Sequence, residues 1–405
     1  MSKNIQSILL SAFFAVVAGS AQAAAPCSGQ IANPLTVFFS GFAFVGDSEE
    51  SKVFKYTSQL VKKKDPDGKF LLGGTLKDAV ANVHNPCFKL ETGLADKSKG
   101  NDIVMGFAIS WENVAVEKLG DKYLVVTDIH GTLLVVDFEE KRYIGAFPVR
   151  VQLRDLRSES PTDQDKLSTI EKLYLTHDYP VNVMDEVVKR LETIELKRRY
   201  SKYIQVTKHD GILEDKAKEM VKQYAPKDSV MDDFSNLVGE TFTSLLAINQ
   251  NLPIIPYNAP NGTMQAKFND RSVMFKMPDP NSVSQVKLTL RGFKKVELGK
   301  TYAYTALGYG AFIHLHVTSL QDRENLNSRV QVLDAAIKDV LVENVPASQS
   351  NVDDWTNYQR SMLYLFDNVT KQITQRDGRW LKESSKNEDF GDQMESFAKL
   401  LDGLR

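Results

Sequence analysis

Stretches with strand character alternate with stretches of helical character along this 405-residue chain, and this order limits the fold most strongly. From about residue 33 to 154, β-branched and aromatic runs are separated by turn residues, which predicts an antiparallel meander. Over residues 155–250 these runs disappear and apolar residues recur at helical spacing. Strand character returns from Leu252, and helical patterns close the chain. We therefore expect an α+β fold.

The helical spacing places individual helices. It predicts one helix from near Asn182, one from near Ser229, and a shorter one around 213–220. Near the end of the chain it predicts helices over 329–342, 352–375 and about 390–401. We expect all of them to bury one apolar face.

A tight turn is predicted inside the first strand-rich stretch. The runs 123–127 and 132–138 are joined through Asp128-Ile-His130-Gly131. A polar residue followed by Gly is typical of two-residue hairpin turns, so we expect the chain to reverse here.

These patterns divide the chain into five segments. We expect a signal peptide at 1–23, an N-terminal α+β lobe at 24–160, a helical connector at 161–250, a C-terminal α+β lobe at 251–345 and terminal helices at 346–405. The fold is thus predicted as two antiparallel-sheet-plus-helix lobes joined by a helical connector.

The two lobes show a weak internal similarity. Leu119, Gly120, Tyr123 and Gly131 recur as Leu298, Gly299, Tyr302 and Gly310, each shifted by 179 positions. One interpretation is an internal pseudo-repeat. The alternative is that β-hairpins share turn residues for physical reasons.

Residues 1–23 have the three parts of a secretory signal. Lys3 precedes an apolar stretch from Ile8 to Val17, and small residues end at Ala21-Gln22-Ala23. The apolar stretch is about half the roughly 20 residues that a membrane-spanning helix needs. We expect cleavage near Ala23, a periplasmic or secreted protein, and no membrane span after cleavage. Pro26 before Cys27 departs from the lipoprotein pattern, so no lipid anchor is expected.

Cys27 and Cys87 are the two cysteines of the chain. In an exported protein an even cysteine count favours pairing, and we predict a Cys27–Cys87 disulfide. Closing a loop of about 60 residues is worth roughly 4 kcal/mol in the chain-entropy model. The alternative is a redox or metal-binding thiol that uses His84.

Charge and motifs narrow the function classes. Lys and Arg total 50 against 52 Asp and Glu, so there is no basic excess for a nucleic-acid partner. The chain has no phosphate-binding loop, no Gly-x-Ser-x-Gly and no His-Glu-x-x-His. We therefore expect no cofactor, name no catalytic residue, and favour a non-enzymatic protein.

Histidines offer the remaining chemistry. His314 and His316 share one face of a predicted strand and could bind a metal ion. No third ligand is evident nearby in the sequence, so the alternative is that the two histidines lie on a solvent-exposed strand face. Three acid–histidine pairs also occur: Asp128 with His130, one residue apart, and the adjacent pairs His177-Asp178 and His209-Asp210. We interpret all three pairs as turn residues rather than general bases.

Two surface patterns could bind a ligand. Lys197, Arg198, Arg199 and Lys202 concentrate positive charge after a predicted helix, where cations are also favourable for the helix itself. Tyr302, Tyr304 and Tyr309 could form an aromatic platform for sugar or peptide, and cross-strand packing is the alternative.

Taken together, these features favour an exported, non-enzymatic protein that binds or assembles cell-envelope components through protein–protein contacts. The alternatives are a periplasmic hydrolase acting on an envelope polymer and a sugar- or peptide-binding module. The hydrolase requires at least two histidines to converge with a carboxylate in one cleft.

Overall fold

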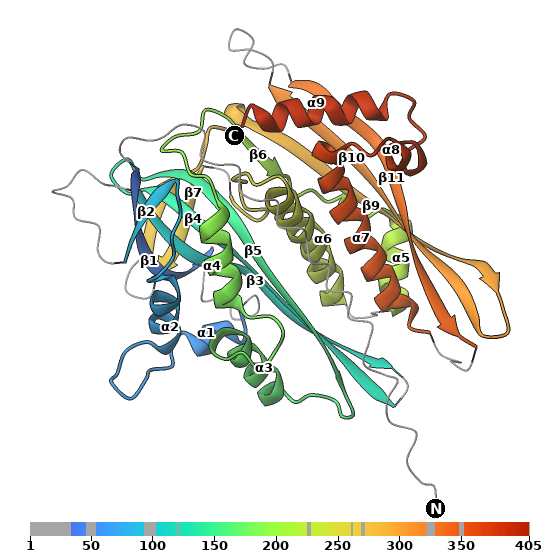
Figure 1. Cartoon of the computed structure of the whole chain (residues 1–405), viewed down its shortest axis with the longest axis horizontal. Helices are drawn as coiled ribbons and strands as arrows, with labels where there is room; N and C mark the ends of the chain where they lie inside the picture. Colours follow the sequence, from blue (N-terminus) through green and yellow to red (C-terminus); the bar gives the residue numbers. More distant parts are fainter. Residues whose placement is uncertain are drawn as a thin grey trace, which may run out of the picture.

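The computed structural model of the chain describes residues 34–45, 54–92, 103–119, 121–224, 228–260, 262–268, 272–320, 329–347 and 352–404. Two β-sheets and several helices build this part of the chain, so the predicted α+β class is confirmed. In Figure 1, helices α1 to α4 lie on one side of the larger sheet, and α6 and α7 lie between the two sheets.

The larger sheet has seven strands in the order β2-β1-β3-β4-β5-β8-β7. Its long strands β3, β4 and β5 form an antiparallel meander, as predicted. Strand β1 runs parallel to β2 and β3 and also pairs with β7. The strand bounds are β1 (Leu35–Val45), β2 (Phe88–Thr92), β3 (Ile103–Leu119), β4 (Lys122–Asp137), β5 (Arg142–Arg157), β7 (Thr263–Phe268) and β8 (Ser272–Lys276).

Four helices cover the larger sheet on the face away from the second sheet: α1 (Thr57–Leu60), α2 (Leu71–Val80), α3 (Asp163–Leu175) and α4 (Val183–Thr193). Helix α4 shows why they form. The Asn182 side chain caps its first turn by accepting hydrogen bonds from the Met184 and Asp185 amides. Val183, Val187 and Leu191 recur every four residues and are fully buried. The helix predicted from near Asn182 is therefore confirmed.

The smaller sheet has the order β11-β10-β9-β6, with β6 parallel to β9 and the rest antiparallel. Its strands are β6 (Tyr203–Val206), β9 (Val283–Lys300), β10 (Tyr304–Leu320) and β11 (Arg329–Pro346), and a short 3₁₀ turn, Pro280–Ser282, leads into β9. One face packs on the helices α5 (Asp215–Tyr224), α6 (Asp228–Asn249), α7 (Asp354–Gln375), α8 (Gly378–Ser384) and α9 (Phe390–Asp402). The helices predicted near 213–220, from Ser229, over 352–375 and near 390–401 are all present.

Polar contacts join the elements of the larger sheet to α6 and the segment that follows it. Arg190 of α4 donates to the Ala247 carbonyl and the Asn251 side chain at the end of α6, at 3.1 and 3.2 Å, where helix carbonyls lack intrahelical partners. The Ile254 amide donates to the Ala146 carbonyl of β5 at 2.9 Å. Both contacts hold α6 and the segment that follows it against the larger sheet.

Both sheets contain the same strand arrangement. In each, a first strand (β1 or β6) runs parallel to the first strand of a long antiparallel meander, and helices follow the meander. An internal duplication would explain this similarity, and the pseudo-repeat remains a prediction.

The predicted turn at His130-Gly131 is wrong, because both residues lie in the middle of the continuous strand β4. A Cβ on Gly131 would lie 2.5 Å from the Phe107 ring of β3. Gly131 is therefore needed for close strand packing, not for a chain reversal.

The predicted helix over 329–342 is also wrong, because this segment is strand β11. Its Ala, Asp and Lys residues suit a helix, but a continuous ladder pairs it with β10 from Arg329 to Pro346. Tertiary pairing here outweighs local propensity, since Leu333, Ala335 and Ile337 alternate into the core.

The expected segment boundaries also differ from the observed packing. The segment 161–250 is no independent connector: α3 and α4 pack on the larger sheet, whereas β6, α5 and α6 belong with the smaller one. Strands β7 and β8, inside the expected C-terminal lobe, join the larger sheet.

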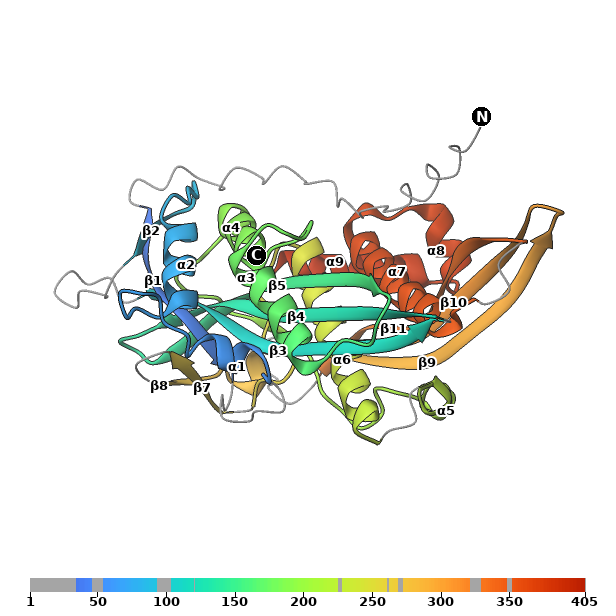
Figure 2. The same ribbon diagram turned by 90° about the horizontal axis from the view of Figure 1, so that it is seen from below.

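The far ends of β9, β10 and β11 project beyond the helices (Figure 2). We call residues 294–310 and 338–346 the arm. Within the part of the chain that the structure describes, the helices are too short or too polar to cross a membrane.

Candidate functional site

A buried polar cluster lies on the face of the larger sheet turned toward α6 and α7. Strand alternation puts Asp128 and His130 of β4 on the same face, and their cross-strand partners are Gln152 and Arg150 of β5. Arg150 Nη2 lies 3.0 Å from Asp128 Oδ1, and His130 Nε2 lies 3.3 Å from the same oxygen. Gln152 also donates to Asp128. The Trp111 ring packs edge-on against His130.

Electrostatics fix the charges in this cluster. Burial opposes ionisation of Asp128, but the Arg150 charge and the hydrogen bonds outweigh it and hold the pKa of Asp128 well below its usual range. Burial lowers the pKa of His130, against the opposing effect of Asp128. The side chains of His130 and Asp128 are 1% and 4% exposed, so a substrate has no access to them. The cluster is a buried network that links β4 to β5, and His130 Nδ1 has no hydrogen-bond partner among the described residues.

A small cavity lies between this sheet and α6. Its volume is about 10 Å³, the size of one water molecule. Glu240 lines it together with Thr132 and Thr243, and the two threonine hydroxyls have no hydrogen-bond partner among the described residues. Burial raises the pKa of Glu240 to about 7, although Asn258 donates a hydrogen bond to it. Glu240 was not among the residues predicted from the sequence, where its only signal is an acid among apolar positions of α6.

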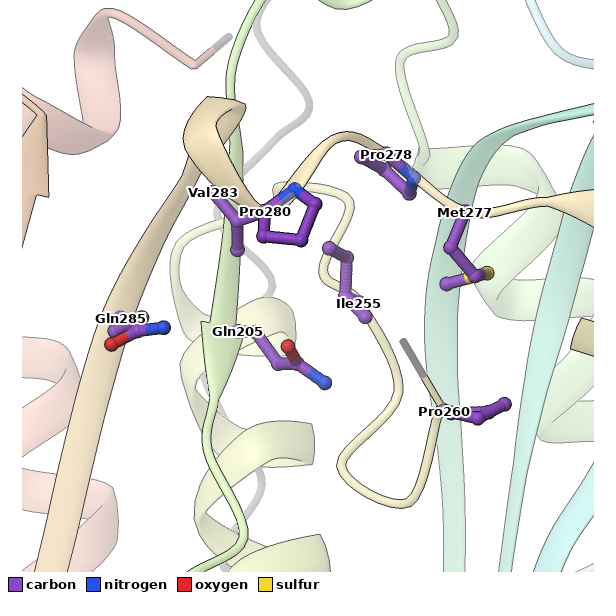
Figure 3. Close-up of a pocket in the computed structure, with 8 residues that line it drawn as sticks. All are labelled: Gln205, Ile255, Pro260, Met277, Pro278, Pro280, Val283 and Gln285. Carbon is purple, nitrogen blue, oxygen red and sulfur yellow. The ribbon is translucent and has the colours of Figure 1, made fainter. Parts of the chain in front are cut away.

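A second cavity opens where β6, β9 and the segments around them meet (Figure 3). Its volume is about 30 Å³, against the roughly 300–1,000 Å³ typical of small-molecule pockets. The lining residues are Gln205, Ile255, Pro260, Met277, Pro278, Pro280, Val283 and Gln285. Two amides and no charged group lie among them, so the cavity offers little to orient a reacting substrate.

His314 and His316 lie on the outer face of the smaller sheet, the face turned away from the helices. Their third neighbour is Asp334 of β11, whose Oδ1 lies 2.9 Å from His314 Nε2 and 3.4 Å from His316 Nδ1. All three side chains are about one-third exposed or more. Across the residues that the structure places, no group of three or more His, Cys, Asp and Glu is arranged to hold a metal ion.

The other histidines lie elsewhere. His177 is exposed and pairs with Asp185 at 3.2 Å, and His209 contacts the Leu288 carbonyl at 3.0 Å. The interpretation of Asp128 and His130 as turn residues is wrong, because β4 carries them into the buried cluster. Among the described residues, His314 and His316 are the one pair of histidines that shares a carboxylate, on an open sheet face outside both cavities.

The predicted basic residues Lys197, Arg198, Arg199 and Lys202 are all exposed. They follow α4 after it ends at Thr193, in the segment that leads to β6. Arg199 pairs with Glu140 at 3.1 Å, so part of the positive charge is neutralised. Lys197, Arg198 and Lys202 have no acidic partner among the residues described.

The predicted tyrosine platform is not formed. Tyr309 is fully buried on the inner face of β10, where its hydroxyl donates to Asp354 at 2.7 Å. Tyr302 and Tyr304 are 99% and 42% exposed at the tip of the β9–β10 hairpin. The rings are separated because Tyr309 and Tyr304 stand on opposite faces of the strand.

Cys27 and the signal segment 1–23 lie outside the described residues. Cys87 is buried just before β2. The disulfide and the export signal therefore stay predictions.

An apolar cluster lies on the outer face of the arm. Val296, Leu298 and Val340 converge over Gly308, where a Cβ would lie 3.1–3.2 Å from their side chains. Val342 is the cross-strand partner of Gly308 in β11. Leu298, Val342 and Val340 are 54%, 52% and 40% exposed. We call these four apolar residues around Gly308 the outer patch.

No protein-family model matches the chain, and a search of curated proteins finds no match. The function must therefore be argued from the geometry. Sequence reasoning missed the outer patch because Val340 and Val342 fell in a predicted helix, although the short β-branched run Val340-Leu341-Val342 is also compatible with a strand.

Proposed function

We propose that this chain is an exported, non-catalytic protein that binds or assembles cell-envelope components, and that the arm makes the contact. The observation that supports the proposal is the outer patch. Apolar side chains gathered on a protruding sheet face mark interaction sites, since scattered exposed apolar residues are ordinary but contiguous ones are not. The patch spans three strands and belongs to a surface without helices over it (Figures 1 and 2).

The strand edges of the arm add to this support. Helices α8 and α9 and their connection protect β11 near its start: Ser385 donates to the Ala336 carbonyl, and Gln393 accepts from the Asp334 amide. Strand β11 pairs with β10 along one edge. From Val340 to Val345, no described strand pairs with its other edge. A free strand edge beside an apolar face is a common recognition surface.

The rival functions have less support. A hydrolase needs imidazoles and a carboxylate in a cleft. In the part of the chain that the structure describes, the one place where two imidazoles meet a carboxylate, His314 and His316 with Asp334, lies on an open sheet face. A sugar- or peptide-binding module centred on the three tyrosines would need Tyr309 at the surface, but its ring is buried in the core.

The test compares complexes extracted from the envelope with a mild detergent. Size-exclusion chromatography should show the parent protein in a complex larger than the free chain. The double variant Leu298→Asp with Val342→Asp should elute as the free chain, because two carboxylates disrupt the outer patch. Met274→Asp is the matched control, since Met274 is 60% exposed on β8, outside the arm. Identical elution of the parent and double variant would overturn the proposal.

A further inference from the structure

The outer face of the smaller sheet carries unpaired positive charge beside the outer patch. Lys294 is the cross-strand partner of Gly310, and Lys338 is the partner of Phe312. Lys287, opposite His316, extends the row toward the base of the sheet. All three lysines are exposed, and none pairs with an acid among the described residues.

Negative charge on this face is scarce. Asp334 is shared by His314 and His316. Glu297 and Glu343 are both register partners of Leu307, which stands on the inner face of β10 with Tyr309. Glu343 pairs there with Arg360 of α7 at 2.7 Å. A complementary surface must therefore be apolar opposite the outer patch and anionic around it.

The tip of the arm adds exposed aromatic rings. Tyr302 is 99% exposed in the β9–β10 turn, and Tyr304 is 42% exposed on the same strand face as Gly308. Tyrosine is favoured where one end of a side chain meets apolar material and the other meets water. The step from Tyr304 to Gly310 spans six residues, or about 20 Å of strand at about 3.3 Å each.

We propose that the arm docks with its outer face on an anionic lipid surface. This inference rests on the proposed function of the arm and names its partner. The outer patch enters the boundary between headgroups and acyl chains, where interfacial apolar residues lie. Lys294 and Lys338 then reach the anionic headgroups, and each such contact contributes favourably near a charged membrane. A lipid surface offers negative charge over the whole 20 Å span, whereas a protein would need a matching acidic rim.

Vesicle flotation tests this inference. The probes are vesicles of pure phosphatidylcholine and vesicles with phosphatidylcholine and phosphatidylglycerol in equal parts, at low salt. The parent protein should bind the anionic vesicles at least tenfold more tightly than the neutral ones. Two double variants should each bind the anionic vesicles at least tenfold more weakly than the parent. They are Lys294→Glu with Lys338→Glu, and Leu298→Asp with Val342→Asp. Met274→Asp should bind like the parent. All variants are prepared with the same N-terminus as the parent, so that differences in binding come from the substitutions alone.

Circular dichroism establishes that each variant is folded before binding is compared. Equal binding to both vesicles, or anionic binding that neither arm variant weakens, would overturn the lipid inference. If vesicles are not bound while the outer patch still cross-links to an envelope protein, the lipid inference fails and the proposed function of the arm stands. If the patch contacts neither, both fail.

Discussion

Arg150 of β5 reaches diagonally across the strand pair to Asp128 of β4, with Nη2 and Oδ1 3.0 Å apart and the Asp128 side chain 4% exposed. The pair ties the middle of the meander together on the face toward α6. Removing only the carboxylate leaves a guanidinium that is largely buried and has lost its partner.

Asp128→Ala should therefore lower the free energy of unfolding by about 3 kcal/mol, as measured by urea denaturation. The control is Glu383→Ala, which breaks the exposed Arg379–Glu383 pair within α8. It should leave the free energy of unfolding nearly unchanged, because solvent screens an exposed ion pair. Equal effects of the two substitutions would contradict the importance of the buried cluster.

Gly131 should tolerate no side chain. Gly131→Ala places a methyl group against the Phe107 ring and should cost about 1–3 kcal/mol in the same assay. In Gly391→Ala in α9, the added methyl group meets no atom of a neighbouring described segment within 4 Å, so the change should be neutral or stabilising by up to about 1 kcal/mol. If Gly131→Ala is as stable as the parent, the observed register of β3 and β4 is wrong.

The comparison of the helices with Gly131 shows where sequence reasoning succeeds and where it fails. Long helices with regular apolar spacing, such as α4 and α6, could be predicted because one buried face determines them. His130-Gly131 has the local signature of a turn, yet the pairing of a 16-residue strand decides its structure. Local chemistry cannot show which neighbour a strand will have.

The candidate sites were harder to predict for the same reason. Asp334 joins His314 and His316 from a strand that the sequence pattern suggested was a helix. The outer patch depends on β9, β10 and β11 lying side by side, which no single segment reveals. Tyr302, Tyr304 and Tyr309 were correctly placed near one hairpin, but strand alternation divides them between two faces.

Glu240 should make stability depend on pH. Its pKa of about 7 in the folded protein lies above the value near 4.3 of an unfolded glutamate. The folded state thus keeps a proton that the unfolded chain loses, so this stabilising contribution is complete below pH 4.3 and is lost as pH rises to about 7.

Glu240→Gln should remove this slope. The difference in unfolding free energy between the variant and the parent should grow in favour of the variant by up to roughly 3 kcal/mol as the pH rises from 4 to 8. Glu192→Gln, an exposed position of α4, is the control and should leave the slope unchanged. A Glu240→Gln slope equal to that of the parent would rule out a buried, protonated Glu240. The other buried acids contribute equally to both proteins, so the difference isolates Glu240.

Thiol labelling tests the predicted Cys27–Cys87 bridge. Denatured, unreduced protein should take up no label, and reduction should expose two thiols by intact mass. N-terminal sequencing of the same exported material should begin at Ala24. Two labelled cysteines before reduction would refute the disulfide, and a retained Met1 would refute export by signal cleavage.

Photo-cross-linking in intact cells tests the role of the arm most directly. Benzoylphenylalanine would replace Leu298 or Val342 in the outer patch, and Met274 as the exposed control. The account predicts discrete adducts to an envelope component, lipid or protein, from both arm positions and none from position 274. No adducts from either arm position, or the same adducts from all three positions, would contradict it.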